Sequence, residues 1–108
     1  ANVARVLPEW ASLHVDRGTW NPQPIFNFLI ARGNVAQNEA EKTFNMGIGM
    51  VVIVAAQDAD ATISTLANRG LTSWALGTIS QRADGEMGDA AAKGGKGGAV
   101  SVVGNYAN

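Results

Sequence analysis

Cysteine is absent from the 108-residue sequence, and histidine occurs once, as His14. The lack of cysteine excludes disulfides, thiolate nucleophiles, iron–sulfur clusters and cysteine-ligated zinc. A single histidine cannot form an HExxH zinc motif, and no serine lies in the GxSxG pattern of a hydrolase. Strand-like alternation around His14 predicts that it is simply exposed. Residue chemistry alone therefore predicts no catalytic residue and no metal site.

The sequence also lacks an excess of either charge and any long apolar run. Its 8 basic and 9 acidic side chains are scattered, with a formal net charge of -1, so no positive field exists for nucleic acid or an anionic membrane. The longest apolar run, at 48–56, is too short for a membrane helix, and the amino terminus has no signal-peptide pattern. We expect a cytoplasmic protein with no nucleic-acid or membrane partner.

The apolar content is sufficient for one core. The sequence is 46% hydrophobic and 16% charged, as in ordinary globular proteins, and its length suits one domain. The chain starts at Ala1, and the opening residues ANVARVLP carry no cap or turn signal. We therefore expect a piece of a longer chain.

In the first half of the chain, hydrophobic patterning predicts one strand and two helices. Leu13 and Val15 alternate with polar residues, which predicts a half-buried strand. In the segment NPQPIFNFLIARG, at 21–33, two prolines suit a first helical turn and Gly33 suits the carboxy-terminal cap. A short surface helix is expected to end near Thr43.

In the second half, the unbroken apolar run at 50–56 predicts a central strand covered on both faces. A helix is expected within 57–70, followed by strands within 73–80 and 99–104. The Gly/Ala-rich segment at about 83–98 predicts a flexible loop. The fold class is therefore α+β: a ferredoxin-like sandwich whose mainly antiparallel sheet of about four strands carries helices on one face.

Three short patterns suggest ligand chemistry, and each has a simpler explanation. Asp58 and Asp60 could bind magnesium, yet they precede an apolar helix and suit its amino-terminal cap. GGKGG at 94–98 lacks the rest of a GxxxxGK[ST] phosphate loop. The tryptophans and phenylalanines lack the interleaved basic residues of a single-strand binder, so we expect them in a core or an interface.

The segment KTFNMGIGMVVIV, at 42–54, passes from polar residues through a GxG into the apolar run. A dinucleotide fingerprint would follow a strand, open a helix and contain a third glycine. Gly47 and Gly49 instead precede the expected strand. They either present groups to a ligand or only allow a helix and a strand to pack closely.

Four segments of the chain carry a family resemblance. They are NVARVLP at 2–8, W.P.PIFNFL at 20–29, TFNMGIGMVV at 43–52 and SWALGTI at 73–79. Together and in this order, they resemble aminoimidazole ribonucleotide synthase, also called phosphoribosylformylglycinamidine cyclo-ligase, of purine biosynthesis. The resemblance extends to about residue 79 and resumes in the final strand. The Ala/Gly-rich segment between them departs from the family's short, charged hairpin.

The resemblance implies that residues 1–108 are the single C-terminal domain of a larger enzyme, with the N-terminal ATP-binding domain absent from this chain. The family enzyme uses ATP and magnesium to activate the amide oxygen of formylglycinamidine ribonucleotide. A ring-forming nitrogen then displaces phosphate, giving aminoimidazole ribonucleotide. The implied partners are the chain's own N-terminal domain, a second subunit in a homodimer and the small-molecule ribonucleotide. This segment alone is expected to bind neither cofactor and to be inactive.

The resemblance and the glycine turn together indicate candidate substrate-binding residues. They are Thr43, Asn45, Gly47, Gly49 and Arg5. The glycines would let the chain turn at a cleft edge, so that backbone amides and the side chains of Thr43 and Asn45 face the ligand. Arg5 could contact a phosphate, or it could form a surface ion pair. No catalytic residue and no metal ligand is expected here.

Two alternatives remain open. The parent could be another ATP-using enzyme of the same superfamily, similar to selenophosphate synthetase or to a hydrogenase-maturation protein. The chain could instead be a stand-alone ferredoxin-like regulatory module that binds a small molecule, since that topology serves many functions. The segment TFNMGIGM, at 43–50, favours the purine enzyme.

Overall fold

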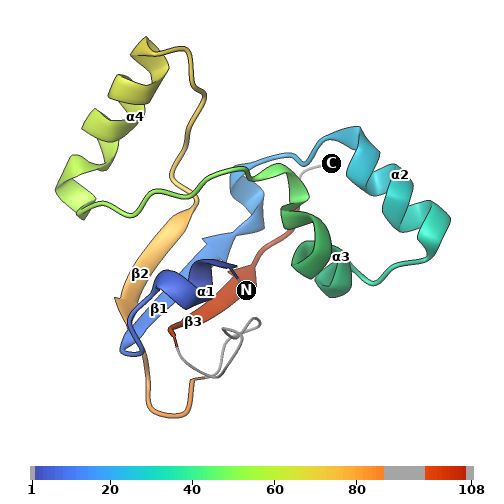
Figure 1. The fold of residues 1–108 in the computed structure, drawn as a ribbon, viewed down its shortest axis with the longest axis horizontal. Coiled ribbons are helices and arrows are strands. Elements are labelled where there is room, and N and C mark those ends of the chain that lie inside the picture. Colours follow the sequence, from blue (N-terminus) through green and yellow to red (C-terminus); the bar gives the residue numbers. More distant parts are fainter. Residues whose placement is uncertain (1, 87–96, 107–108) are drawn as a thin grey trace.

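The computed structural model describes residues 2–86 and 97–106, and a mixed three-stranded sheet forms its centre (Figure 1). The strands are β1 (Ala11–Asp16), β2 (Gly77–Gln81) and β3 (Ala99–Val103). β1 lies in the middle, antiparallel to β2 and parallel to β3. Both edges of β1 are therefore occupied.

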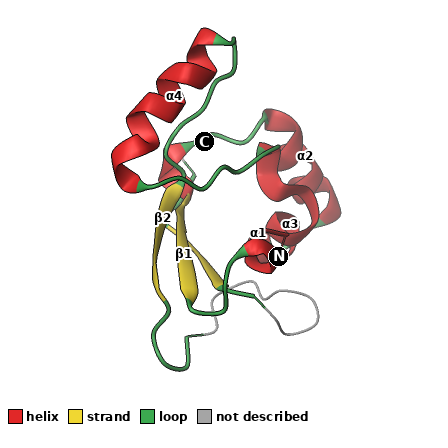
Figure 2. Ribbon diagram, turned by 60° about the vertical axis from the view of Figure 1, so that its left-hand side comes forward, coloured by secondary structure: helices red, strands yellow, loops and turns green. Residues whose placement is uncertain are grey.

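The described helices are α1 (Asn2–Val6), α2 (Pro24–Gly33), α3 (Gln37–Phe44) and α4 (Ala59–Asn68). Short 3₁₀ turns occur at Arg17–Thr19, Asn45–Gly47 and Ala56–Asp58. α2 and α3 form a helical hairpin on one side of the sheet, whereas α4 projects away from it (Figure 2). No helix among the described residues has the length and apolar composition to cross a membrane.

The core lies between α1 and one face of the sheet. Side chains alternate between the two faces of a strand, so Ala11, Leu13 and Val15 share this face of β1, and all three are buried. They form one cluster with Ala4, Leu7 and Val100. This small core fixes the sheet and the start of the chain.

The α+β class is confirmed, but the ferredoxin-like sandwich with a mainly antiparallel sheet of about four strands is not. The described sheet has three strands, and one of its two pairings is parallel. The helices do not share one face, because α4 projects away from the sheet (Figures 1 and 2). The direction of β3 depends on its crossover, which local patterning does not reveal.

The predicted strand at 50–56 is wrong. These residues form no strand, and the Met50 side chain is 83% exposed. The centre of the sheet is taken by β1, which β2 and β3 flank, and the run pairs with the outer edge of neither β2 nor β3. The apolar run instead crosses from α3 to α4 outside the sheet (Figure 1).

The expected helices and the other strands are present, with differences at their ends. Gly33 is the last residue of α2, and Asn34 takes the left-handed cap conformation with a φ of 50°. Asp58 occupies the cap position of α4, but its side chain makes no capping hydrogen bond. The short helix α1 was not predicted, because no cap or turn residue marks it.

Part of the segment expected to be flexible forms a hydrogen-bonded turn. The carboxylate of Glu86 accepts hydrogen bonds from the Ser12 hydroxyl at 2.5 Å and from the Ala83 amide at 3.0 Å. These bonds, the Ser12 bond above all, lower the pKa of Glu86. The turn is therefore tied to β1. Residues 87–96 of the expected loop lie outside the described residues.

Many apolar side chains have no cover. The Cα radius of gyration is 14.7 Å, compared with about 13 Å for a compact domain of this length. Exposed large apolar residues occur on α2, on the run after α3 and before β2: Ile25, Phe28, Met50, Val52, Ile53, Leu71 and Trp74. The fold thus leaves apolar surface that the described residues do not cover.

Candidate pocket at the glycine turn

The family-like segment after α3 begins with three consecutive positive φ values. They are 55° at Asn45, 50° at Met46 and 90° at Gly47. Asparagine and glycine tolerate this region, whereas a methionine there costs roughly 1–3 kcal/mol. Such strain persists only where neighbouring structure holds it, and it is concentrated at functional sites. The turn is therefore a candidate site.

Tertiary contacts hold this turn in place. The Met46 side chain is only 2% exposed, and its carbonyl oxygen accepts a hydrogen bond from Trp20 Nε1 at 3.1 Å. The Ile48 amide donates to the Asn45 carbonyl oxygen at 3.1 Å. A Cβ at Gly47 would lie 2.1 Å from Gln23 Oε1. The φ of 90° favours glycine at this position, whereas the end of the flexible Gln23 side chain could move aside.

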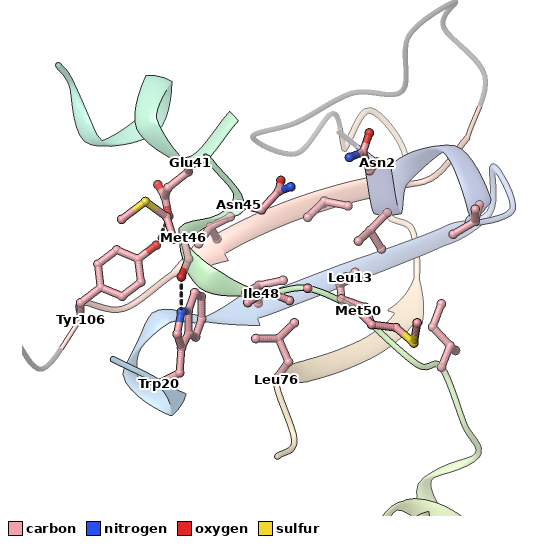
Figure 3. Close-up of a pocket in the computed structure, with 18 residues that line it drawn as sticks. Asn2, Leu13, Trp20, Glu41, Asn45, Met46, Ile48, Met50, Leu76 and Tyr106 are labelled. Carbon is pink, nitrogen blue, oxygen red and sulfur yellow. Dashed lines mark hydrogen bonds between the residues drawn. The ribbon is translucent and has the colours of Figure 1, made fainter. Parts of the chain in front are cut away.

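A pocket of about 330 Å³ lies between this turn and the sheet (Figure 3). Its apolar lining comes from α1, from the sheet and the residue before β2, and from the turn and the run after it: Val3, Val6, Leu13, Val15, Val100, Val102, Leu76, Met46, Ile48, Met50, Val51 and Ile53. Polar or amphipathic side chains also line it, namely Asn2, Trp20, Glu41, Asn45 and Tyr106. An apolar cavity with a few polar groups is the usual composition of a small-molecule site.

Two of the five candidate binding residues lie at this pocket. Asn45 and Gly49 line it. Thr43 is exposed on α3, Arg5 is exposed on α1, and Gly47 lies next to Gln23, none of them lining the pocket. The structure thus brings Asn45 and Gly49 together and leaves the other three outside. The roles of all five residues in substrate binding stay predictions.

Sequence reasoning missed a group of three polar residues, of which Glu41 and Tyr106 line the same pocket. The carboxylate of Glu41 binds the guanidinium of Arg17 and the hydroxyl of Tyr106. The bond to Glu41 raises the pKa of Arg17, and burial together with the same carboxylate raises the pKa of Tyr106. No sequence signal links these three residues, because they lie far apart in the chain.

The aromatic residues next to the turn pack against one another. The Trp20 ring meets Tyr106 edge-on, with ring centroids 5.2 Å apart, and lies 6.4 Å from the Trp74 ring. The expectation that tryptophans serve packing is confirmed for Trp20. Trp10, by contrast, is 62% exposed.

The described residues do not fit a metal site. Within 2–86 and 97–106, no three His, Asp or Glu side chains come together in a way that could hold a metal ion. Asp58 and Asp60 start α4, away from the pocket. No step of a reaction is therefore assigned to a metal held by these residues.

The family model described as AIR synthase related protein, C-terminal domain, matches residues 1–89. The chain belongs to this family. The resemblance seen in the four sequence segments is therefore confirmed, and the strained turn lies in the part of the chain that carries the match.

Relatives named phosphoribosylformylglycinamidine cyclo-ligase are similar over most of the chain. The protein of Methylobacillus flagellatus is 45% identical over 85 residues, which are 79% of this chain and 25% of the relative. The protein of Neisseria gonorrhoeae is 47% identical over 85 residues, which are again 79% of this chain and 25% of the relative. A protein of Streptomyces fradiae, which carries the name provisionally, is 44% identical over 98% of this chain and 54% of its own length. The chain thus spans between about a quarter and just over half of the length of these relatives.

Proposed function

We propose that this chain acts as the C-terminal domain of a phosphoribosylformylglycinamidine cyclo-ligase. The intact enzyme would use ATP to close the imidazole ring of aminoimidazole ribonucleotide from formylglycinamidine ribonucleotide, releasing ADP and phosphate. The family match and the names of the relatives support this proposal. The observation that carries it is that the family segment at 43–52 folds into a strained turn lining a pocket.

In this proposal, the domain binds and orients the ribonucleotide and supplies no catalytic residue. The carboxamide of Asn45 can both donate and accept hydrogen bonds, as recognition of an amidine, amide or sugar hydroxyl requires. The apolar lining keeps water away from the bound face of the ligand. Thr43, Gly47, Gly49 and Arg5 remain candidates for further contacts.

We assign ATP and magnesium to the remainder of the parent protein. Phosphoryl transfer needs a metal cation near the developing charge, and the described residues contain no cluster of His, Asp or Glu side chains that could hold one. Magnesium–ATP would activate the amide oxygen of the substrate in the intact enzyme. We therefore expect the 108-residue chain alone to be inactive.

The partners that we propose are the ATP-binding domain of the same protein and a second subunit in a homodimer, in the cytoplasm. The uncovered apolar residues of α2 and of the run after α3 support a docked domain. So does the length of the relatives, of which the chain spans a quarter to a half.

A chimeric enzyme tests the proposal. In the Neisseria gonorrhoeae relative, the matched quarter is replaced by this chain, and the chimera is assayed for ATP-dependent ring closure. We expect activity, with Asn45→Ala raising the KM for the ribonucleotide about tenfold or more, as expected when one hydrogen bond to a polar ligand is lost. Asn68→Ala, at the exposed last position of α4, is the matched control.

A folded but inactive chimera would contradict the cyclo-ligase assignment. Calorimetric titration of the 108-residue chain separates the remaining possibilities. Binding of magnesium–ATP to the chain alone would contradict the assignment of the nucleotide to the rest of the protein. Tight binding of a different small metabolite by the chain alone would favour the regulatory-module alternative.

A further inference from the structure

We propose that Arg17, Glu41 and Tyr106 form a positioning network that holds Asn45 at the pocket. This role rests on the proposed binding of substrate by Asn45. None of the three was among the sequence candidates, and none is assigned contact with the ligand here.

The network converges on one carboxylate. Arg17 Nε donates to Glu41 Oε2 and Arg17 Nη2 donates to Glu41 Oε1, both at 2.9 Å, which forms a two-pronged ion pair. The Tyr106 hydroxyl donates to Glu41 Oε2 at 2.7 Å. The side chains of Arg17 and Glu41 are only 16% and 14% exposed. A two-pronged, largely buried pair fixes direction as well as distance.

These bonds leave Glu41 poorly suited to bind a ligand itself. Its two carboxylate oxygens accept three hydrogen bonds from the protein, and the remaining Arg17 nitrogen, Nη1, donates to the Gly104 carbonyl oxygen at 3.0 Å. Glu41 nevertheless lines the pocket. Its role is therefore to hold other groups in place.

The network is linked to the strained turn in two ways, along α3 and through Trp20. Glu41 lies four residues before Asn45, one helical turn along α3, so fixing Glu41 fixes the end of that helix. Tyr106 packs edge-on against Trp20, and Trp20 in turn holds the Met46 carbonyl oxygen. The chain of contacts thus runs from Arg17 through Glu41, Tyr106 and Trp20 to the residue after Asn45. Figure 3 shows Glu41, Tyr106, Trp20 and Asn45 around the same cavity.

Charge explains why the pair is needed. Glu41 is in the carboxy-terminal half of α3, where the helix dipole disfavours a negative charge. An unpaired carboxylate there would also lose solvation, and Arg17 offsets both effects. The same helix carries a second ion pair, Lys42–Glu39, at 3.7 Å with side chains 49% and 62% exposed. Exposed pairs of this type contribute little, so Glu39 provides a matched control.

A double-mutant cycle in the chimeric enzyme tests the network. Tyr106→Phe removes only the hydroxyl and keeps the ring against Trp20. We expect it to raise the KM for the ribonucleotide about tenfold, the order expected for one lost hydrogen bond to a charged group, with little change in kcat. Glu41→Gln should act in the same direction, and Glu39→Gln should leave the KM unchanged.

The cycle distinguishes positioning from general support of the fold. If Tyr106 acts through Asn45, Tyr106→Phe should have no further effect on KM when Asn45 is already alanine. If the two substitutions instead raise the KM independently, so that their effects multiply in the double variant, the network is overturned while the proposed function stays intact. An inactive chimera, or an active one in which Asn45→Ala has no effect, would overturn the substrate role of Asn45 and this proposal with it.

Amide hydrogen exchange on the 108-residue chain adds a readout that needs no activity. Tyr106→Phe should speed exchange at Ile48, whose amide donates to the Asn45 carbonyl oxygen, by about tenfold. The amide of Leu13, in the central strand, should exchange as in the wild type. Unchanged exchange at Ile48 would overturn the proposal.

Discussion

Trp20 and Met46, which are 26 residues apart, are joined by a hydrogen bond from the indole nitrogen to the main-chain carbonyl oxygen at 3.1 Å. Trp20 follows the end of the central strand, and Met46 is the buried middle residue of the strained turn. The bond therefore ties the family segment at 43–52 to the sheet. Several consequences of this arrangement can be measured.

Replacing Trp20 with phenylalanine should weaken the turn. The Met46 carbonyl oxygen loses its side-chain donor, so we expect the free energy of unfolding to fall by about 1–2 kcal/mol. Urea denaturation followed by far-UV circular dichroism measures the change without relying on tryptophan fluorescence. Trp10→Phe, at a 62% exposed side chain, should change stability by less than about 0.5 kcal/mol. Equal losses in both variants would contradict the importance of the bond.

Gly47→Ala should destabilise the protein, whereas Gly49→Ala should not. Alanine at Gly47 must adopt a φ of 90° and place its Cβ 2.1 Å from Gln23 Oε1, so we expect a loss of about 1–3 kcal/mol. No atom lies within 4 Å of a Cβ at Gly49, and the change there should stay within about 1 kcal/mol. Thermal unfolding compares the two variants. Adding Gln23→Ala to Gly47→Ala should recover the part of the loss caused by the collision.

Gly77→Ala should damage the sheet itself. Gly77 is the glycine of the family-like SWALGTI segment, and a Cβ there would lie 1.9 Å from the His14 carbonyl oxygen in the neighbouring strand. Backbone atoms cannot move away as a flexible side chain can, so we expect a loss of about 3 kcal/mol or more. Thr78→Ala, at the next and exposed position, is the control in urea denaturation. A fully stable Gly77→Ala protein would contradict the pairing of β1 with β2.

The bonds to Glu86 predict a loss of stability in acid. They lower its folded-state pKa below the ordinary 4.5, so the folded protein binds fewer protons than the unfolded chain in this range. The stabilisation is present above about pH 4.5 and disappears as the pH falls through the folded-state pKa. Unfolding free energies measured from pH 7 to pH 3 should therefore decline less steeply in Glu86→Gln.

Ser12→Ala provides a second test of the same interaction. It removes the hydroxyl that contributes most to the lowered pKa of Glu86 and keeps the carboxylate. Its stability should also depend less steeply on pH than that of the wild type. Wild-type slopes in both variants would show that the Ser12–Glu86 bond does not form in solution.

Local patterning predicted most elements correctly but not how they assemble. Alternation at Leu13 and Val15 predicted β1, and the two prolines at 22 and 24 predicted the start of α2. The run at 50–56 was assigned to a strand because its composition suits one. Composition cannot show which segments pair, and this run pairs with none of the three strands, so the prediction was wrong.

The site was predicted only in part, for the same reason. Asn45 and Gly49 belong to a recognisable segment and line the pocket, so a sequence reading could find them. Arg17, Glu41 and Tyr106 have no motif, and their contact depends on where α3 and the end of the chain come to lie. Only the tertiary structure shows that Arg17 and Tyr106 both bind the carboxylate of Glu41.

The sequence by itself determined α2, α3, α4, three strands and the family, because periodicity, turn residues and motifs are properties of neighbouring residues. Tertiary structure alone decided the mixed sheet, the exposed run at 50–56 and the strained turn with its polar support. These features depend on which backbone edges are free and on which distant side chains meet. Such contacts join segments that are far apart in the chain, and local sequence patterns do not reveal them.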